Sequence, residues 1–191
     1  MPHLTFNLEH VPAPTGDMLV ATDDEGSLRA LDWEDYEARM HRLLRLHYGA
    51  NNVTLIAATS VSAARRSVER YLEGDLLAID NLPVKTGGTA FQREVWAALR
   101  AIPAGQTVSY GAMALRLDRP KTTRAVGVAI GANPVGVVVP CHRVLGADAS
   151  LRGYGGGLKR KRWLLEHEGV RLPLRRRNAN RTIICCEEEH Q

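Results

Sequence analysis

The chain has 191 residues, and 45% of them are apolar, which suits one domain or two small ones and excludes a generally disordered protein. The formal net charge of +4 is compatible with nucleic acid binding but is weak evidence alone. The three cysteines form no disulfide framework, and neither a signal peptide nor an apolar run of membrane-spanning length is visible. We therefore expect a cytoplasmic protein with no membrane partner.

The pattern of residues 1–85 predicts a small α+β scaffold, and no cluster of candidate catalytic residues is visible in it. Three prolines and a glycine within residues 1–16 indicate an irregular arm. The elements expected after this arm are a β-hairpin over 18–33, an amphipathic helix from 35 to about 48, a short strand over 53–57 and a serine-capped helix that ends near residue 73.

A change of character follows at residues 82–88, where a proline and two glycines indicate a linker. We place the domain boundary after residue 85. Beyond it, Thr89 and Gln92 match the capping-box pattern, in which the hydroxyl bonds forward and the side-chain amide bonds back. An apolar stripe continues from this cap and predicts a helix that ends before Pro103.

Two shorter helices are expected next. Ser109 can cap a helix from Tyr110 to about Leu117, and a further helix runs from Lys121 to about Gly131. Two short helices joined by a tight turn, the second small-faced and basic, predict a helix-turn-helix. A plain helical hairpin produces a similar pattern and stays open as the alternative.

The segment that follows places three chemically active side chains after an apolar run. The valine-rich residues 135–139 call for burial in an extended segment, and Pro140 prevents a regular ladder from continuing. Cys141, His142 and Arg143 come directly afterwards. Cys141 is therefore either a buried structural thiol or a nucleophile in a pocket wall. Neighbouring side chains of an extended segment point apart, so direct contact between the thiol and the imidazole is not expected.

The last part of the chain adds a flexible loop, a helix and a tail. Residues 153–157 are rich in glycine and allow close backbone approach to a ligand, without the spacing of a dinucleotide-binding fingerprint. A helix is expected over 159–168. We expect residues 174–191 to be disordered. Cys185 and Cys186 lie there without a second cluster at ligand spacing, so no metal site is predicted.

The stretch Val139-Pro140-Cys141-His142-Arg143-Val144 resembles the active-site signature of the methylated-DNA–protein-cysteine methyltransferases, the O6-alkylguanine-DNA alkyltransferases. Further matches stand in the family's order and spacing at Tyr110, Arg124-Ala125-Val126-Gly127, Asn133-Pro134, Gly153-Tyr154, Gly156-Gly157, Leu164-Leu165 and Glu168-Gly169. The resemblance is strong from about residue 88 to 170. It is looser over 15–85, where the chain is similar to bacterial members, and it does not cover the tail.

This resemblance implies a ribonuclease H-like N-terminal domain over 1–85 and a winged-helix-like, DNA-binding and alkyl-transfer domain over 86–173. It also implies the activity: an alkyl group moves once, irreversibly, from O6 of guanine in DNA to Cys141, and no cofactor takes part. Whether O4-alkylthymine is also a substrate stays open.

The resemblance further implies a role for each catalytic residue. The Cys141 thiolate attacks, a water links it to His142, Glu168 holds the far ring nitrogen, Tyr110 gives a proton to N3 of the base, and Asn133 braces the helix-turn-helix against the active-site strand. The predicted substrate contacts are Val144, Tyr154, Gly155 and Gly156. The Gly155 amide is expected to donate to O6, and glycine where the family often has serine is expected to widen the pocket.

The implied partner is double-stranded DNA that contains alkylated guanine. A stacked base cannot reach a pocket thiol, so the family flips it out, working from the minor groove. Arg124 is expected to fill the vacated stack, with Thr123 and Gly127 on the same helix. Arg119 and Lys121 are expected to contact phosphates. We expect a monomer, and cooperative binding along DNA stays open.

Two other readings of the same residues are a cysteine hydrolase that uses Cys141, His142 and Glu168, and a DNA-binding module without catalysis. The hydrolase requires turnover and a second hydrogen-bond donor for the oxyanion. The only candidates for this donor in the sequence are the backbone amides of glycines. The binding module does not require Cys141, which is present here.

Overall fold

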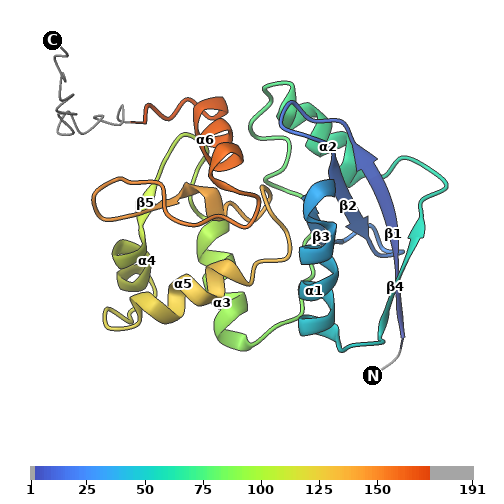
Figure 1. Ribbon diagram of the computed structural model, residues 1–191, viewed down its shortest axis with the longest axis horizontal. Helices are drawn as coiled ribbons and strands as arrows, with labels where there is room; N and C mark the ends of the chain where they lie inside the picture. The colour runs from blue at the N-terminus through green and yellow to red at the C-terminus, as the bar shows by residue number, and fades with distance from the viewer. Residues whose placement is uncertain (1–2, 173–191) are drawn as a thin grey trace, which may run out of the picture.

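The computed structural model describes residues 3–172, which form a sheet-based N-terminal part beside a helical C-terminal part (Figure 1). The predicted tail, with Cys185 and Cys186, lies outside the described residues. Among residues 3–172, none of the helices combines the length and the apolar character that a bilayer crossing requires.

A four-stranded sheet in the order β3-β2-β1-β4 forms the N-terminal part. Its strands are β1 (Leu4–Val11), β2 (Met18–Thr22), β3 (Leu28–Trp33) and β4 (Val53–Ala57). The strands β2 and β3 pair antiparallel, which confirms the predicted hairpin. The pair β1–β2 is also antiparallel, and the pair β1–β4 is parallel.

The irregular arm expected over residues 1–16 is wrong, because Leu4–Val11 is an inner strand of this sheet. Pro12 and Pro14 lie just beyond the strand, so they end it and do not interrupt it. The alternation of Leu4, Phe6 and Leu8 along this segment was the signal that the prolines obscured.

Helices cover both faces of the sheet. A 3-10 helix, η1 (Glu34–Tyr36), leads into α1 (Glu37–Tyr48), whose Met40 and Leu44 pack with Phe6 and Leu19. On the other face, α2 (Ala63–Leu72), capped by Ser62, packs through Val68. This second face belongs to a core that continues into the C-terminal part, so the two parts share one hydrophobic interior.

The C-terminal part consists of α3 (Ala90–Arg100), α4 (Tyr110–Arg116), α5 (Thr123–Gly131) and α6 (Leu158–His167), with a short parallel pair of strands, β5 (Val108–Ser109) and β6 (Val144–Leu145). Both hydrogen bonds of the predicted capping box between Thr89 and Gln92 are present. Ser109 caps α4 as expected. The helices α4 and α5 pack against each other across a short turn, which is the arrangement of a helix-turn-helix.

The valine-rich run is buried as predicted, because Val135, Val137, Val138 and Val139 are each at most 4% exposed. The prediction that it is extended like a strand is wrong. It forms turns that touch β3 through one isolated bridge, Leu31 to Val135, and Val137 has a positive φ of 64°. A 3-10 helix, η2 (Cys141–Arg143), follows it. The Asn133 side chain donates to the carbonyls of Val135 and Val139 and accepts from Val135 N, and these bonds replace a strand ladder and override the local β preference of valine.

The capping box supplies the first prediction. Thr89→Ala removes the side-chain oxygen that accepts from the backbone N–H of Gln92. We expect the free energy of unfolding, measured by urea denaturation, to fall by about 1 kcal/mol. Thr59→Ala is the matched control, because Thr59 is exposed and makes no side-chain hydrogen bond within the described part of the chain. Equal losses in the two variants would contradict a capping role.

Candidate active site

Cys141 lies at the start of η2, is 7% exposed and forms part of the wall of a cavity of about 560 Å³. The other lining residues come from α1, α4, α5 and the glycine-rich loop: Arg39, Arg42, Tyr110, Gly127, Ile130, Gly131, Gly153, Tyr154 and Gly155. A thiol in the wall of a cavity of this size fits a nucleophile better than a purely structural cysteine.

Behind the thiol, a buried carboxylate collects hydrogen bonds from three side chains. Glu168, at the end of α6, accepts from His142 Nε2 at 2.8 Å and from Tyr71 Oη at 2.8 Å, both at Oε1. Arg143 donates from Nη2 to Oε1 at 2.7 Å and from Nε to Oε2 at 2.9 Å. The pairing of His142 with Glu168 agrees with the expectation.

The protonation states in this cluster follow from burial and from the partners. Burial alone would raise the pKa of Glu168, but the donors His142 and Arg143 hold it well below its usual range. Burial lowers the pKa of His142, with Arg143 and Lys161 adding to the effect, and burial raises the pKa of the Cys141 thiol. At rest the pair is therefore a neutral thiol and a neutral imidazole. Glu168 favours the charged imidazole, as expected, but burial outweighs its effect on the pKa of His142.

A neutral His142 that donates from Nε2 to Glu168 keeps a lone pair on Nδ1. This Nδ1 is buried and has no hydrogen-bond partner within residues 3–172. It is thus available to accept, through one water, the proton that Cys141 must lose before it attacks.

Asn133 connects the sulfur to the turn that presents it. Its Nδ2 donates to Val139 O at 2.9 Å, to Val135 O at 3.3 Å and to Cys141 Sγ at 3.4 Å, and its Oδ1 accepts from Val135 N at 3.0 Å. The contact to sulfur opposes the effect of burial on the pKa of Cys141. The expected bracing role therefore has its contacts, and the same amide also stabilises negative charge on sulfur.

The predicted substrate contacts fall into two groups. Tyr110 and Gly155 line the cavity, and burial together with nearby Cys141 raises the pKa of Tyr110, so its hydroxyl remains a donor. Tyr154 also lines it and is partly buried, and its buried Oη has no hydrogen-bond partner in the part of the chain that the structure describes. Val144 and Gly156 lie outside the lining: the Val144 carbonyl accepts from Lys161 Nζ at 2.6 Å, and Gly156 packs on the ring of Trp33.

Glycine at position 155 does not widen the cavity as expected. A Cβ built there would lie 2.4 Å from the guanidinium carbon of Arg39, so the Arg39 side chain already occupies the space that a serine would need. Arg39 is held by an ion pair with buried Asp32 at 2.5 Å and donates to Asn133 O at 3.2 Å. The wall beside Gly155 is therefore supplied by the N-terminal part.

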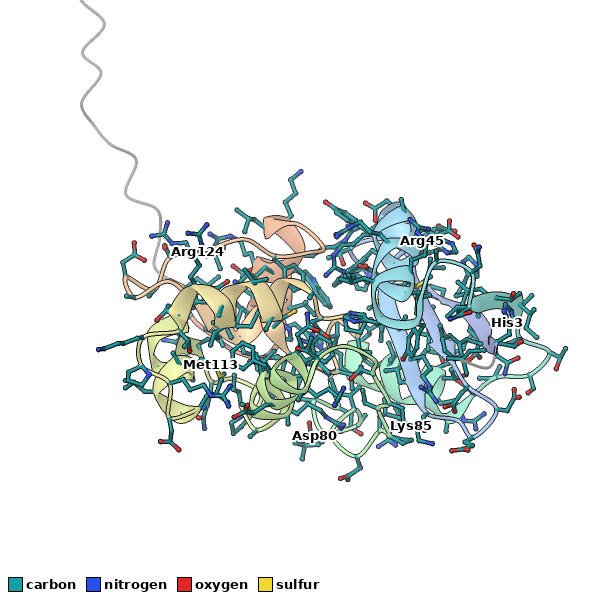
Figure 2. The ribbon with its side chains drawn as sticks, turned by 90° about the horizontal axis from the view of Figure 1, so that it is seen from below. His3, Arg45, Asp80, Lys85, Met113 and Arg124 are labelled. Atoms are coloured by element: carbon teal, nitrogen blue, oxygen red, sulfur yellow. The ribbon has the colours of Figure 1, made fainter. Side chains whose placement is uncertain are left out.

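The residues expected to bind DNA lie on and next to α5. Thr123, Arg124 and Lys121 are exposed, and Figure 2 shows Arg124 at the outer surface of the C-terminal part. Gly127 borders the cavity opposite the ring of Tyr110. Arg119 is exposed but pairs with Glu94 at 3.0 Å, so a phosphate contact requires it to exchange partners.

Four residues close to the site have no counterpart in the expectations. Arg39 and Arg42 come from α1 and Tyr71 from α2, where apolar periodicity was the visible signal. Lys161 of α6 is fully buried, donates to two backbone carbonyls, and has its pKa lowered to about 8 by burial. No local motif marks any of them, because each reaches the site through the packing of elements distant in sequence.

Known proteins share both parts of this arrangement. Residues 10–86 match the family model of the 6-O-methylguanine DNA methyltransferase, ribonuclease-like domain. Residues 90–170 match the family model of the 6-O-methylguanine DNA methyltransferase, DNA binding domain. A methylated-DNA–protein-cysteine methyltransferase of Salmonella typhimurium is 49% identical over 164 residues, covering 86% of this chain and 96% of that protein. The one of Haemophilus influenzae is 38% identical over 165 residues, covering 84% and 85%.

Solved structures give the same picture. The crystal structure of Mycobacterium tuberculosis O6-methylguanine methyltransferase matches with a TM-score of 0.69 and 35% identity, covering 85% of this chain and 92% of that one. A complex of Mycobacterium tuberculosis OGT with DNA matches with a TM-score of 0.69 and 33% identity, covering 86% and 92%.

The fold and the site define a two-part protein in which a ribonuclease-like domain supports a DNA-binding domain that carries a cavity cysteine. The chain belongs to the methylated-DNA–protein-cysteine methyltransferase family.

The buried carboxylate supplies the second prediction. Glu168→Gln leaves Arg143 buried without its counter-ion, and we expect a loss of about 3 kcal/mol in the free energy of unfolding at pH 7. Because the folded-state pKa of Glu168 is depressed, its contribution is present above the ordinary value of 4.5 and is lost as the pH falls below it. Wild-type stability should therefore decline in acid more steeply than that of the variant.

Urea titrations at several pH values measure both effects. Glu166→Gln is the control, because Glu166 is exposed and pairs only loosely with Arg162, at 3.4 Å. A Glu168→Gln variant as stable as the control, or with the same acid sensitivity as wild type, would contradict this account.

Proposed function

We propose that this protein repairs DNA by moving an alkyl group from O6 of guanine to Sγ of Cys141, once per molecule and without a cofactor. The observation that carries the proposal is the placement of Cys141 in the cavity wall, with the pair of His142 and Glu168 behind it and the helix-turn-helix beside it. The names of the relatives support the same chemistry.

The groups at the site account for each proton and bond. The thiol proton passes through one water to Nδ1 of His142, and Glu168 stabilises the imidazolium that forms. The bond between sulfur and the alkyl carbon forms as the bond from that carbon to O6 breaks, and its electron pair leaves with the guanine. Tyr110 is placed to give the leaving base a proton, and the proton on His142 then returns through water to the tyrosinate, so the thiol proton is balanced by the one gained by guanine. A neutral thioether has no easy leaving group, so the protein is consumed.

The arrangement supports entry of a base from double-stranded DNA. Gly127, Ile130 and Gly131 of α5 line the cavity directly, so the helix that meets DNA is also a wall of the pocket. Figure 2 shows Arg45 of α1 and Arg124 on the same side of the molecule, so positive charge from both parts is available to phosphates. The small exposed residues of α5 suit the minor groove.

The remaining expectations belong to the same proposal. We propose a monomer that acts in the cytoplasm, with the domain boundary near residue 85. Phosphate contacts come from Lys121 and from Arg119 once it leaves Glu94.

The third prediction tests the transfer. After incubation with a duplex oligonucleotide containing O6-methylguanine, we expect the mass of one methyl group on the peptide that contains Cys141, with no further turnover. Cys141→Ala should take up no methyl group and should still bind the oligonucleotide. Continued turnover would indicate a hydrolase instead, and an unmodified wild-type protein would indicate a binding module.

The fourth prediction concerns base extrusion. Arg124→Ala should slow transfer from duplex DNA by about tenfold or more, because no side chain then fills the vacated stack, but should leave attack on a free O6-alkylguanine base nearly unchanged. Single-turnover rates with both substrates measure the difference. Arg66→Ala, which removes an exposed arginine of α2, is the control for loss of charge. Equal losses with both substrates would rule out the intercalating role of Arg124.

A further inference from the structure

A tyrosine of the N-terminal part touches the catalytic carboxylate. Tyr71 lies near the end of α2, is fully buried, and its hydroxyl donates to Glu168 Oε1 at 2.8 Å. Its backbone carbonyl also contacts His167 Nε2 at 2.7 Å, and its ring meets the His167 ring edge-on with centroids 5.1 Å apart. These contacts join α2 to α6 at its last residue, His167, and at Glu168, which follows it.

The oxygen that Tyr71 contacts is the one that faces the imidazole. Oε1 of Glu168 accepts from Tyr71, His142 and Arg143, whereas Oε2 accepts only from Arg143 within the described residues. Three donors share the negative charge of one oxygen, so the strength of the bond to His142 depends on the other two. Burial and the nearby carboxylate raise the pKa of Tyr71 well above its usual range, so its hydroxyl remains a donor.

We propose that Tyr71 is a positioning residue of the alkyl transfer: its hydroxyl orients Glu168 toward His142 and limits how strongly the imidazole holds a proton. The inference rests on the proposed function and deepens it, because it makes the ribonuclease-like domain a contributor to the proton relay. His167 of α6, the neighbour of Glu168 in the sequence, contacts the backbone carbonyl of Tyr71.

The direction of the effect follows from the charges around His142. Arg143 of η2 and Lys161 of α6 favour the neutral imidazole, and Glu168 favours the charged one. The ring of Tyr154 lies edge-on at 6.4 Å and adds no charge. Without the Tyr71 hydroxyl, more of the charge on Oε1 acts on His142, so the imidazolium becomes more stable. A His142 that is already protonated cannot accept the thiol proton, so the acid limb of the rate profile moves to higher pH.

The fifth prediction measures this shift. In Tyr71→Phe, the pH midpoint of the acid limb of single-turnover methyl transfer should rise by about half a unit or more, with rates about threefold lower or worse on that limb. Tyr48→Phe is the matched control, since it also removes a tyrosine hydroxyl, one that contacts the backbone of Lys85 and Gly87 and not Glu168. Its profile should match wild type. A purely structural Tyr71 would lower stability and leave the midpoint in place, which would overturn the proposal.

A second substitution keeps the test decisive where Tyr71→Phe folds poorly. Site-specific 3-fluorotyrosine at position 71 keeps the ring and strengthens the donor, so the midpoint should move to lower pH. An unmoved midpoint in this protein would also overturn the proposal.

Separate experiments can refute the proposed function and the proposed role of Tyr71. A wild-type protein that transfers no methyl group would refute the function. Titration of the His142 ring nitrogens by 15N NMR still reads the effect of Tyr71 in that case. A higher protonation midpoint in Tyr71→Phe than in wild type supports the proposal, and identical midpoints refute it.

Discussion

One buried carboxylate determines how the active site is assembled. Glu168 is 4% exposed, and a charge in that position is stable only because side chains from separate elements surround it. Arg143 comes from η2, which also carries Cys141 and His142. Tyr71 comes from α2 in the N-terminal part. Burial, with Arg143 and Lys161 adding to it, lowers the pKa of His142, so the imidazole stays neutral and free to accept a proton. Folding of the two parts against each other and readiness of the thiol therefore depend on the same contacts.

The sequence predicted those features that local chemistry controls. Caps at Thr89 and Ser109, the helices that they begin and the hairpin of β2 and β3 all follow from neighbouring residues. The cavity cysteine was also predictable, because Pro140 and the residues after Cys141 match a specific signature. Prolines near β1 obscured that strand, since its place inside the sheet depends on pairing with β2 and β4.

The errors share a physical origin. Valine-rich residues ordinarily favour strands, but in residues 135–139 the side-chain amide of Asn133 satisfies backbone carbonyls that a ladder would otherwise pair. Arg39, Tyr71 and Lys161 went unnoticed because helical periodicity assigns a residue to a face but does not identify its distant partner. Only the packed structure shows that the ribonuclease-like domain supplies side chains to the site as well as supporting it.

The contact between Arg39 and Gly155 has a consequence for exchanging halves between relatives. The guanidinium from α1 fills the volume above a glycine in the C-terminal loop, so the two positions are sterically complementary. A hybrid that joined this N-terminal half to a loop with a larger residue at 155 would force either the arginine or the loop to move. Retaining glycine while shortening the α1 side chain would instead enlarge the opening through which a bulky adduct enters. The dimensions of the entrance are thus inherited jointly, and neither half determines them alone.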